Sequence, residues 1–256
     1  MKLRSRFAGR NLLSVFAAVV ALSLSLTVSV NAAVLLSDNF SGTTINTTTW
    51  TPVVLSGASV QFTQNNGLNY QGSLGYDVEG LVTNQAFSGG VEATIQFSNF
   101  TSTTTYPSGY NGAGSFVDLG IGPKANEVDI LLYGDTYGIS GVSGLIITGV
   151  YDHVTASPVP LATPVTEFTS ATGGQFSILY NGSVVSTYYN GALLGTFTPG
   201  WSGPQPFKIV GGDNPNGTTT FTVTNFTVSS VPLPPALLLF GPGLLGLAAV
   251  RRRFKM

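Results

Sequence analysis

The middle of the chain alternates between apolar and polar residues. In residues 91–97 (VEATIQF) the apolar side chains occupy every second position and the polar side chains fall between them. A period of two turns all the apolar side chains of a strand to one face, so this segment is predicted to be an antiparallel strand buried on one side. No helix-period pattern of useful length occurs between residues 34 and 230.

Many short segments of this kind follow one another along the chain. Turn signals rich in asparagine and glycine separate them, among them Asn65-Asn66-Gly67 and Asn216-Gly217. Their spacing predicts an all-β domain, a two-sheet antiparallel sandwich or jelly roll. The further strands are predicted at residues 34–40, 58–64, 79–86, 115–121, 127–133, 144–151, 175–180, 184–189, 206–210 and 219–228.

The pattern also predicts two details of the backbone. Asn181-Gly182 lies between two predicted strands and indicates a two-residue type I′ hairpin. The last strand changes phase, because Phe221 and Val223 fall on one face and the apolar pair that follows falls on the other. An extra residue in that strand, a β-bulge near Asn225, would bring both pairs onto the same face.

The N-terminal end of the chain has a different composition. Residues 1–10 carry four basic side chains, residues 12–30 are an apolar run, and Ala32 and Ala33 follow. This order is that of a secretory signal peptide, so residues 1–32 are predicted to be removed by signal peptidase at Ala32, with Ala33 as the alternative. An uncleaved N-terminal anchor is the other interpretation, and both predict export.

The C-terminal end contains an uncharged segment, residues 233–250, followed by Arg251, Arg252, Arg253 and Lys255. As a helix with a rise of about 1.5 Å per residue, this segment would just cross a hydrocarbon core of about 30 Å. The basic cluster would stay on the cytoplasmic side and leave the preceding domain outside. A C-terminal transmembrane helix, transient or permanent, is therefore predicted.

This tail resembles the PEP-CTERM sorting signal. The likeness rests on Val231-Pro232-Leu233-Pro234, on the apolar helix and on the terminal arginines, in that order. The family usually has Glu where this chain has Leu233. The resemblance implies cleavage by an exosortase-type membrane protease and a place at the outer face of a membrane, the cell surface or the extracellular matrix of a Gram-negative-type cell. A simple tail anchor is the alternative.

Charge is distributed unevenly along the chain. Eight of the ten Lys and Arg residues lie in the two ends, and all eleven Asp and Glu residues lie between them. An acidic domain repels phosphate backbones, so no nucleic-acid partner is predicted. Cysteine is absent, so neither disulfides nor thiolate metal sites contribute. The chain is predicted to consist of a signal peptide (1–32), a β-sandwich domain (33–230) and a sorting signal (231–256).

The domain is similar to the concanavalin A-like (laminin-G-like) superfamily of lectin and glucanase jelly rolls. The likeness rests on the opening Asp38-Asn39-Phe40-Ser41-Gly42 followed by Trp50, on the meander that ends Tyr188-Tyr189-Asn190-Gly191, and on the closing Thr224-Asn225-Phe226-Thr227-Val228. The resemblance implies the fold and leaves the function open, because one fold hosts many functions.

The sharpest candidate for chemistry lies in the strand predicted at residues 127–133. Alternation places Glu127, Asp129, Leu131 and Tyr133 on one face. Laminarinase-like glycoside hydrolases of this jelly roll have a Glu-x-Asp-x-(x)-Glu strand, in which the first Glu is the nucleophile, the Asp assists and the last Glu is the acid/base. Glu127 and Asp129 match the first two positions. The third falls on Leu131 or its neighbour, which is also Leu, and leucine cannot protonate a leaving group. No catalytic residue is therefore assigned, and the domain is predicted not to be an enzyme.

The same strand face could hold a sugar instead. Aromatic rings stack on sugar rings, and the tyrosine hydroxyl tolerates water. The predicted glycan-binding residues are Glu127, Asp129, Tyr133 and Tyr188. An ordinary polar strand face is the alternative for the two carboxylates, and packing in the sandwich core is the alternative for the tyrosines.

Two weaker candidates have simpler explanations. His153 is the only histidine and follows Asp152, but no Gly-x-Ser-x-Gly elbow accompanies them, so a surface position at a strand end is favoured. Residues 213–217 (DNPNG) have the composition of a calcium loop and equally that of a tight turn. No cofactor is predicted, and calcium is left open without a located site.

The sequence thus predicts an exported, non-catalytic surface or exopolysaccharide-associated protein whose jelly roll binds a polysaccharide. A glycoside-active enzyme with relocated acidic residues and a purely structural envelope or biofilm component are the two alternatives.

Overall fold

The computed structural model describes residues 32–56, 62–72, 78–102, 115–134, 144–151, 165–169, 172–213 and 218–231. Residues Ala33–Ser230 form one compact unit. One 3-10 turn, η1 (Lys124–Asn126), lies among its strands. The strands are β1 (Val34–Asp38), β2 (Trp50–Ser56), β3 (Phe62–Gln64), β4 (Leu68–Gln71), β5 (Val78–Thr83), β6 (Val91–Ser102), β7 (Phe116–Ile121), β8 (Glu127–Tyr133), β9 (Gly144–Tyr151), β10 (Val165–Thr169), β11 (Gly174–Tyr180), β12 (Val185–Tyr189), β13 (Ala192–Phe197), β14 (Phe207–Gly212) and β15 (Thr219–Ser230).

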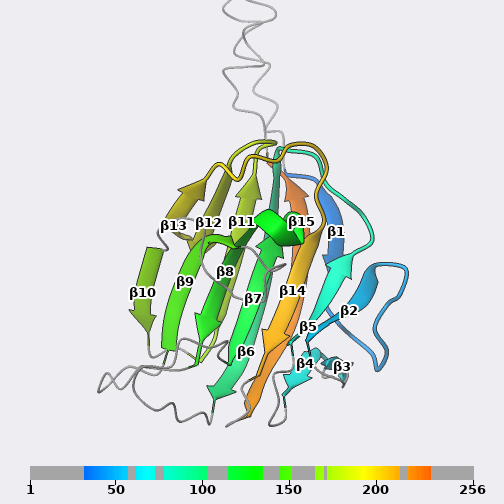
Figure 1. Cartoon of the computed structure of the whole chain (residues 1–256). Coiled ribbons are helices and arrows are strands. Elements are labelled where there is room, and N and C mark those ends of the chain that lie inside the picture. Colours follow the sequence, from blue (N-terminus) through cyan, green and yellow to red (C-terminus); the bar gives the residue numbers. More distant parts are fainter. Residues whose placement is uncertain are drawn as a thin grey trace, which may run out of the picture. The chain divides into compact units, whose positions relative to one another are not determined.

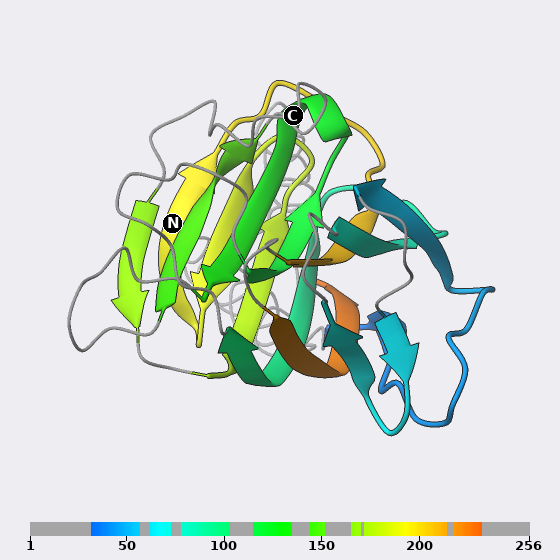
Figure 2. The same ribbon diagram turned by 60° about the horizontal axis from the view of Figure 1, so that its bottom comes forward.

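The strands form two antiparallel sheets stacked as a jelly-roll sandwich (Figures 1 and 2). One sheet has eight strands in the order β13-β12-β11-β6-β15-β4-β3, with β1 also paired to β15. The other has seven strands in the order β10-β9-β8-β7-β14-β5-β2. The predicted all-β, two-sheet antiparallel fold is therefore confirmed.

The core lies between the inner faces of the two sheets and is formed by the apolar side chains at every second position of the strands. Ala93 and Ile95 point into it from β6, and Val128 and Ile130 point into it from β8, all fully buried. Full burial of a side chain of the size of isoleucine contributes about 1.5–3 kcal/mol relative to leaving it exposed. The aliphatic and aromatic residues of this one cluster therefore hold the sheets together.

The opening motif of the domain joins the two sheets through one carboxylate. Oδ1 of Asp38, at the end of β1, accepts a hydrogen bond from the backbone N–H of Phe40, and its Oδ2 accepts one from Nε1 of Trp50, both at 2.8 Å. The indole of Trp50 then packs on Phe226 of β15, with ring centroids 4.8 Å apart. Asp38 thus satisfies the indole N–H at the edge of the core, and the ring fills the space between the sheets.

The predicted bulge in β15 is confirmed. The pairing of β15 with β6 shifts register between Val223 and Asn225. Phe221, Val223, Phe226 and Val228 are consequently all buried in the core, although their spacing in the sequence breaks the period of two. One extra residue in the strand restores the common face.

The predicted type I′ turn at Asn181-Gly182 is wrong. Residues 181–184 form a four-residue connection, and of the pair only Gly182 has a positive φ, 99°. The Asn181 side chain caps this wider loop, because its Oδ1 accepts a hydrogen bond from the backbone at the far end of the loop at 3.0 Å. The two-residue hairpin with positive φ at both positions occurs at the next turn, at Asn190 (47°) and Gly191 (81°).

The strands that alternation missed include both edges of the seven-stranded sheet. β2 and β10 are these edges, and neither was predicted. An edge strand pairs on one side only, so it tolerates a residue such as Pro52, which has no N–H to donate to a neighbour. The short inner strand β4 was also missed.

The two ends of the described domain lie side by side. Ser230 N–H donates a hydrogen bond to the carbonyl of Ala33, and Ala33 N–H donates one to the Ser230 side chain, both at 2.8 Å. Apart from Ala32 and Val231, the predicted signal peptide and sorting signal lie outside the described residues, as does His153. Within the described ranges, no helix has the length and apolar character needed to cross a membrane.

Candidate functional site

The candidate site lies on the outer face of the seven-stranded sheet, around β8. The even-numbered residues of β8 point into the core, so Glu127, Asp129, Leu131 and Tyr133 point to the other side of the sheet. These outward side chains are nevertheless largely buried, with Glu127 4% and Asp129 0% exposed. Two buried carboxylates on one strand face are unusual, because burying a charge costs free energy unless partners compensate it.

The neighbouring strand β7 adds a third carboxyl group to this face. In the antiparallel register Gly120 lies opposite Asp129, and Asp118 lies opposite Leu131. The residues beside Asp118, Val117 and Leu119, belong to the core, so Asp118 points outward with the site. Its side chain is 3% exposed.

Gly120 provides the room in which the first two carboxylates meet. A Cβ atom built on Gly120 would lie 2.4 Å from Oδ1 of Asp129 and 2.5 Å from Oε1 of Glu127. Both oxygens therefore occupy the space that any larger residue at position 120 would need. The carboxyl groups of Glu127 and Asp129 converge above Gly120 for this reason, although they start two residues apart on β8.

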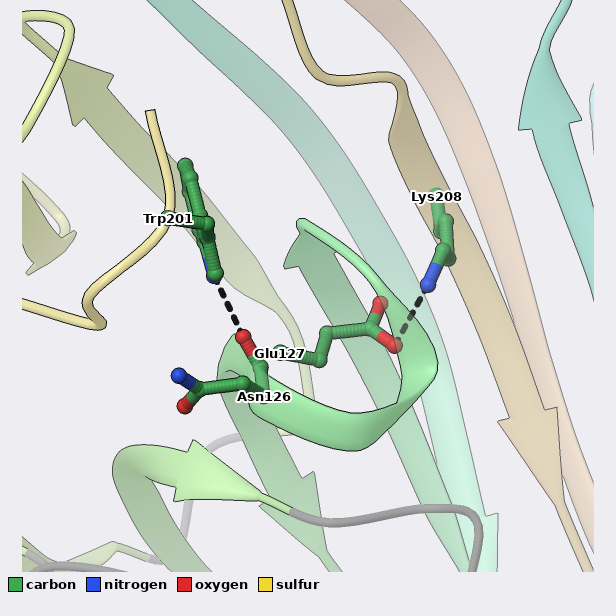
Figure 3. A network of polar contacts seen from close by, with 4 residues as sticks. All are labelled: Asn126, Glu127, Trp201 and Lys208. Carbon is green, nitrogen blue, oxygen red and sulfur yellow. Dashed lines mark hydrogen bonds and ion pairs between the residues drawn. The ribbon is translucent and has the colours of Figure 1, made fainter. Parts of the chain in front are cut away.

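A lysine from β14 neutralises part of this charge. Lys208 lies opposite Gly120 in the register, and its Nζ forms an ion pair with Oε2 of Glu127 at 2.5 Å (Figure 3). The side chains of Lys208 and Glu127 are 10% and 5% exposed. Removing either partner of a buried pair of this kind would leave an uncompensated charge inside the protein.

The remaining carboxyl, that of Asp118, is in a different electrostatic state. Burial raises the pKa of Asp118 well above its ordinary value, the negative charges of Asp129 and Glu127 raise it further, and Lys208 lowers it in part. One ammonium group serves Glu127 directly, so a proton on Asp118 relieves the repulsion. The site therefore combines a carboxyl group whose pKa is raised with a carboxylate that is paired with a lysine.

A phenol completes the buried face. Tyr151 of β9 lies opposite Glu127 and is 3% exposed. Burial raises the pKa of Tyr151 far above its ordinary value, and Tyr133, Asp129 and Asp118 raise it further. Tyr151 therefore stays neutral at all physiological pH values.

The start of β8 is fixed by a loop that follows β13. Nε1 of Trp201 donates a hydrogen bond to the carbonyl of Asn126 (Figure 3). The Asn126 side chain donates one to the carbonyl of Pro199. The indole also lies against Gly122, where a Cβ would come within 2.7 Å of the ring. Glu127, the next residue along the chain, thus begins from an anchored backbone.

The structure brings together three of the four predicted glycan-binding residues. Glu127, Asp129 and Tyr133 share the outer face of β8, whereas Tyr188 lies on β12 of the other sheet. The neighbours of Tyr188 on β12, Thr187 and Tyr189, are buried, and Tyr188 is half-buried on the outer face of the eight-stranded sheet. The set therefore does not form a single surface.

The predicted calcium loop is described only at its first residue. Asp213 is buried, and its Oδ1 accepts a hydrogen bond from the Thr219 hydroxyl at 3.1 Å. Residues 214–217 lie outside the described residues. In the part of the chain that the structure describes, no three His, Cys, Asp or Glu side chains gather in a way that could hold a metal ion.

Sequence reasoning missed Asp118, Gly120 and Lys208. Two of them, Asp118 and Lys208, had a signal in the sequence. Asp118 is the only charged residue in an otherwise apolar strand, and Lys208 is one of only two lysines between the basic ends of the chain. Neither signal predicts that β8, β7 and β14 are neighbours in the sheet. The site depends on that adjacency, because its residues come from all three strands.

Comparison with known proteins identifies solved structures that have a similar fold. No protein-family model and no curated protein matches the sequence. Among solved structures, a non-specific endo-beta-1,3(4)-glucanase from family GH16 aligns with a TM-score of 0.56 at 11% identity, covering 79% of this chain and 92% of the other. A variant of LamA from Zobellia galactanivorans, solved in complex with laminaritriose and laminaritetraose, aligns with a TM-score of 0.54 at 10% identity, covering 77% of this chain and 99% of the other. The catalytic domain of an endo-1,3-beta-glucanase from Thermotoga petrophila aligns with a TM-score of 0.52 at 14% identity, covering 78% and 98%.

These likenesses show a concanavalin-like jelly roll of the kind found in GH16 glucanases. They also correct two predictions, that the protein is a non-catalytic glycan binder and that it is not an enzyme, because the solved structures that align with the domain over nearly their whole length include glucanases. Both predictions rested on the absence of a third carboxyl group along β8. In the β7–β8 register, the carboxyl group of Asp118 on β7 lies opposite Leu131 of β8.

Proposed function

We propose that the domain is a glycoside hydrolase-like enzyme that cleaves a β-linked glucan, with the Glu127 carboxylate as the nucleophile and Asp129 beside it. The observation that carries this proposal is the convergence of both carboxyl groups above Gly120, with Glu127 held by Lys208, on the outer face of a glucanase-like sheet. A cluster of buried ionisable groups with a specific charge partner and a shifted pKa is a candidate functional site.

The geometry suits the nucleophile's task. Attack on an anomeric carbon requires an ionised carboxylate in a fixed orientation. The Lys208 ammonium supplies the counter-charge, and the room above Gly120 leaves the second oxygen of Glu127 beside Asp129. Trp201 fixes the backbone that carries Glu127. The chain itself therefore supplies both the charge and the rigidity that this role needs.

The charge of the domain favours a neutral polysaccharide as the substrate. Between its basic ends the chain has eleven acidic residues and only two lysines. This excess of negative charge would repel uronate-rich or sulfated polysaccharides. The similar solved structures include enzymes described as acting on β-1,3- and β-1,3(4)-glucans. A β-1,3 or mixed-linkage glucan agrees with both observations.

The proposed setting is outside the cell. Residues 1–32 carry the features of a signal peptide, and residues 231–256 carry those of a sorting signal processed by an exosortase-type protease. An enzyme delivered in this way would meet an exopolysaccharide. Fractionation of cells that make the full chain, with the mass of the mature protein determined, tests this part separately.

The release of reducing sugar from laminarin and from mixed-linkage β-glucan tests the activity. The full chain is expected to release sugar, and Glu127→Gln is expected to lower the rate by about 10³-fold or more, because the amide cannot form the glycosyl ester. Glu92→Gln, the same exchange at an exposed site on β6, is the matched control and should leave the rate unchanged. No release by the unaltered chain, or full activity of Glu127→Gln, would refute the proposal.

A further inference from the structure

The glucan-cleaving function proposed above requires a proton donor that β8 does not contain. Hydrolysis needs a second carboxyl group to protonate the leaving oxygen. Of the two positions on β8 that match the motif, Leu132 belongs to the core and Leu131 lies on the outer face with the site. Asp118 lies directly opposite Leu131 in the β7–β8 register. The Cβ atoms of such cross-strand partners are about 4.5–5.5 Å apart, so the Asp118 carboxyl starts one strand over from the expected place.

The surroundings of Asp118 favour a carboxyl group that holds a proton. Within the described ranges its buried Oδ1 has no hydrogen-bond partner, and no lysine other than Lys208, which pairs with Glu127, faces it. The titratable groups around it are Glu127, Asp129 and Tyr133 on β8, Tyr151 on β9 and Lys208 on β14. Burial and the two negative charges on β8 raise the pKa of Asp118, as a general acid at neutral pH requires.

We infer that Asp118 is the proton donor of this site and acts from the adjacent strand in place of the carboxyl group missing at Leu131. As the Glu127 carboxylate bonds to the anomeric carbon, the bond from that carbon to the glycosidic oxygen breaks, and the Asp118 proton goes to the departing oxygen. Asp118, now a carboxylate, then takes a proton from water, whose oxygen bonds to the anomeric carbon and releases Glu127. The sum is one water consumed per bond cleaved.

The other acidic groups are less suited to this role. Tyr151 is buried beside the carboxylates, and its raised pKa makes it too weak an acid to transfer a proton near neutral pH. Asp129 shares the space above Gly120 with Glu127 and therefore lies on the nucleophile's side of the site. Asp118 is the carboxyl group that stands apart from that pair, beside Leu131.

The test compares two substrates that differ in their need for a proton. Asp118→Asn in the full chain is expected to lower laminarin hydrolysis by about 10²–10⁴-fold. Hydrolysis of a 2,4-dinitrophenyl β-glucan oligosaccharide, whose leaving group departs without a proton, should fall by less than about 10-fold. A purely structural role would lower both rates equally and would thereby overturn the inference.

Two further variants test the position and the titration. Leu131→Glu in the Asp118→Asn background should restore laminarin hydrolysis, because it returns a carboxyl group to the expected place. Asp118→Glu should shift the alkaline limb of the pH–rate profile, since activity falls as the acid loses its proton. If Asp118→Asn fails to fold, this shift decides the matter, and an unmoved limb overturns the inference.

The outcomes separate this inference from the proposed function. Full laminarin activity of Asp118→Asn together with an inactive Glu127→Gln would leave the enzyme in place and remove Asp118 from it. Unchanged activity of Glu127→Gln would instead refute the function itself. Asp213→Asn, the same exchange at a buried carboxyl near the end of β14, controls for the effect of the amide on folding.

Discussion

The outer faces of the two sheets both arise from alternating apolar and polar residues, but they differ in the charge and the burial of their polar side chains. On the eight-stranded sheet, uncharged hydroxyls and amides bond to one another across strands, as in Thr94 to Ser177 at 3.0 Å and Thr222 to Asn69 at 2.9 Å. On the seven-stranded sheet, the outward polar groups around β8 are carboxyls and a lysine, and they are buried.

The two faces differ in the free energy that burial of their polar groups costs. Neutral, part-buried cross-strand pairs each contribute only about 0.5–1.5 kcal/mol net to stability. A buried charge that loses its partner costs more, so the groups around Glu127 depend on one another for their compensation. A region that departs from the locally stable solution, while the rest of the same molecule follows it, is where a site is expected.

Removing the lysine should have the largest effect on the seven-stranded face. Lys208→Met leaves the buried Glu127 carboxylate without its counter-ion, and breaking a buried pair in this way costs about 3–5 kcal/mol. Chemical denaturation should show this loss, and the hydrolysis rate should fall with it. Lys124→Met, at an exposed lysine of η1, is the control and should stay within about 0.5 kcal/mol of the unaltered chain. Equal stability of the two variants would break the contrast between the faces.

Filling the space above Gly120 should come next. The Cβ of Gly120→Ala would push against the carboxyl oxygens of both Glu127 and Asp129, and overpacking of this kind costs about 1–3 kcal/mol. Because the carboxylates must move, the rate of glucan hydrolysis should fall more than stability alone explains. Gly80→Ala on β5 of the same sheet, where the closest atoms lie at 3.3 Å, is the milder comparison. An active Gly120→Ala variant would show that the convergence is not needed.

A smaller effect should appear in the pH dependence of stability. The pKa of Asp118 is raised on folding. Its contribution to the free energy of unfolding is therefore fully present below the unfolded pKa of about 3.9 and is lost as the pH rises through the folded pKa. Asp118→Asn should remove this loss and be the more stable form on the alkaline side. Melting temperatures of both forms measured across pH 4–9 would reveal it, and parallel curves would contradict the raised pKa.

The smallest effect is expected on the eight-stranded face. Thr94→Val combined with Ser177→Ala removes both members of a neutral, part-buried hydrogen bond. Replacing both partners by apolar groups is nearly neutral, so stability should change by no more than about 1 kcal/mol and hydrolysis should stay the same. A loss as large as that of Lys208→Met would mean that the two faces do not differ as described.

The sequence by itself determined the class of fold and much of its detail. The period of two placed most strands, and the change of phase around Asn225 located the bulge, because a buried face must remain apolar along a whole strand. It also picked out Glu127 and Asp129 as carboxylates that share a face. Turn geometry was less determined, since the Asn181 side chain could cap a longer loop as well as a tight one.

Only the tertiary structure decided which strands are neighbours, and the candidate site depends on that. β7 is followed in the chain by β8, but β14 inserts between β7 and β5 from far along the sequence, which brings Lys208 to Glu127 across 81 positions. The same packing buries Asp118 opposite Leu131 and leaves Tyr188 on the other sheet. Local patterns report which face a side chain takes, whereas strand order is set by the free energy of the whole sandwich, and so a site built across strands cannot be read from any one of them.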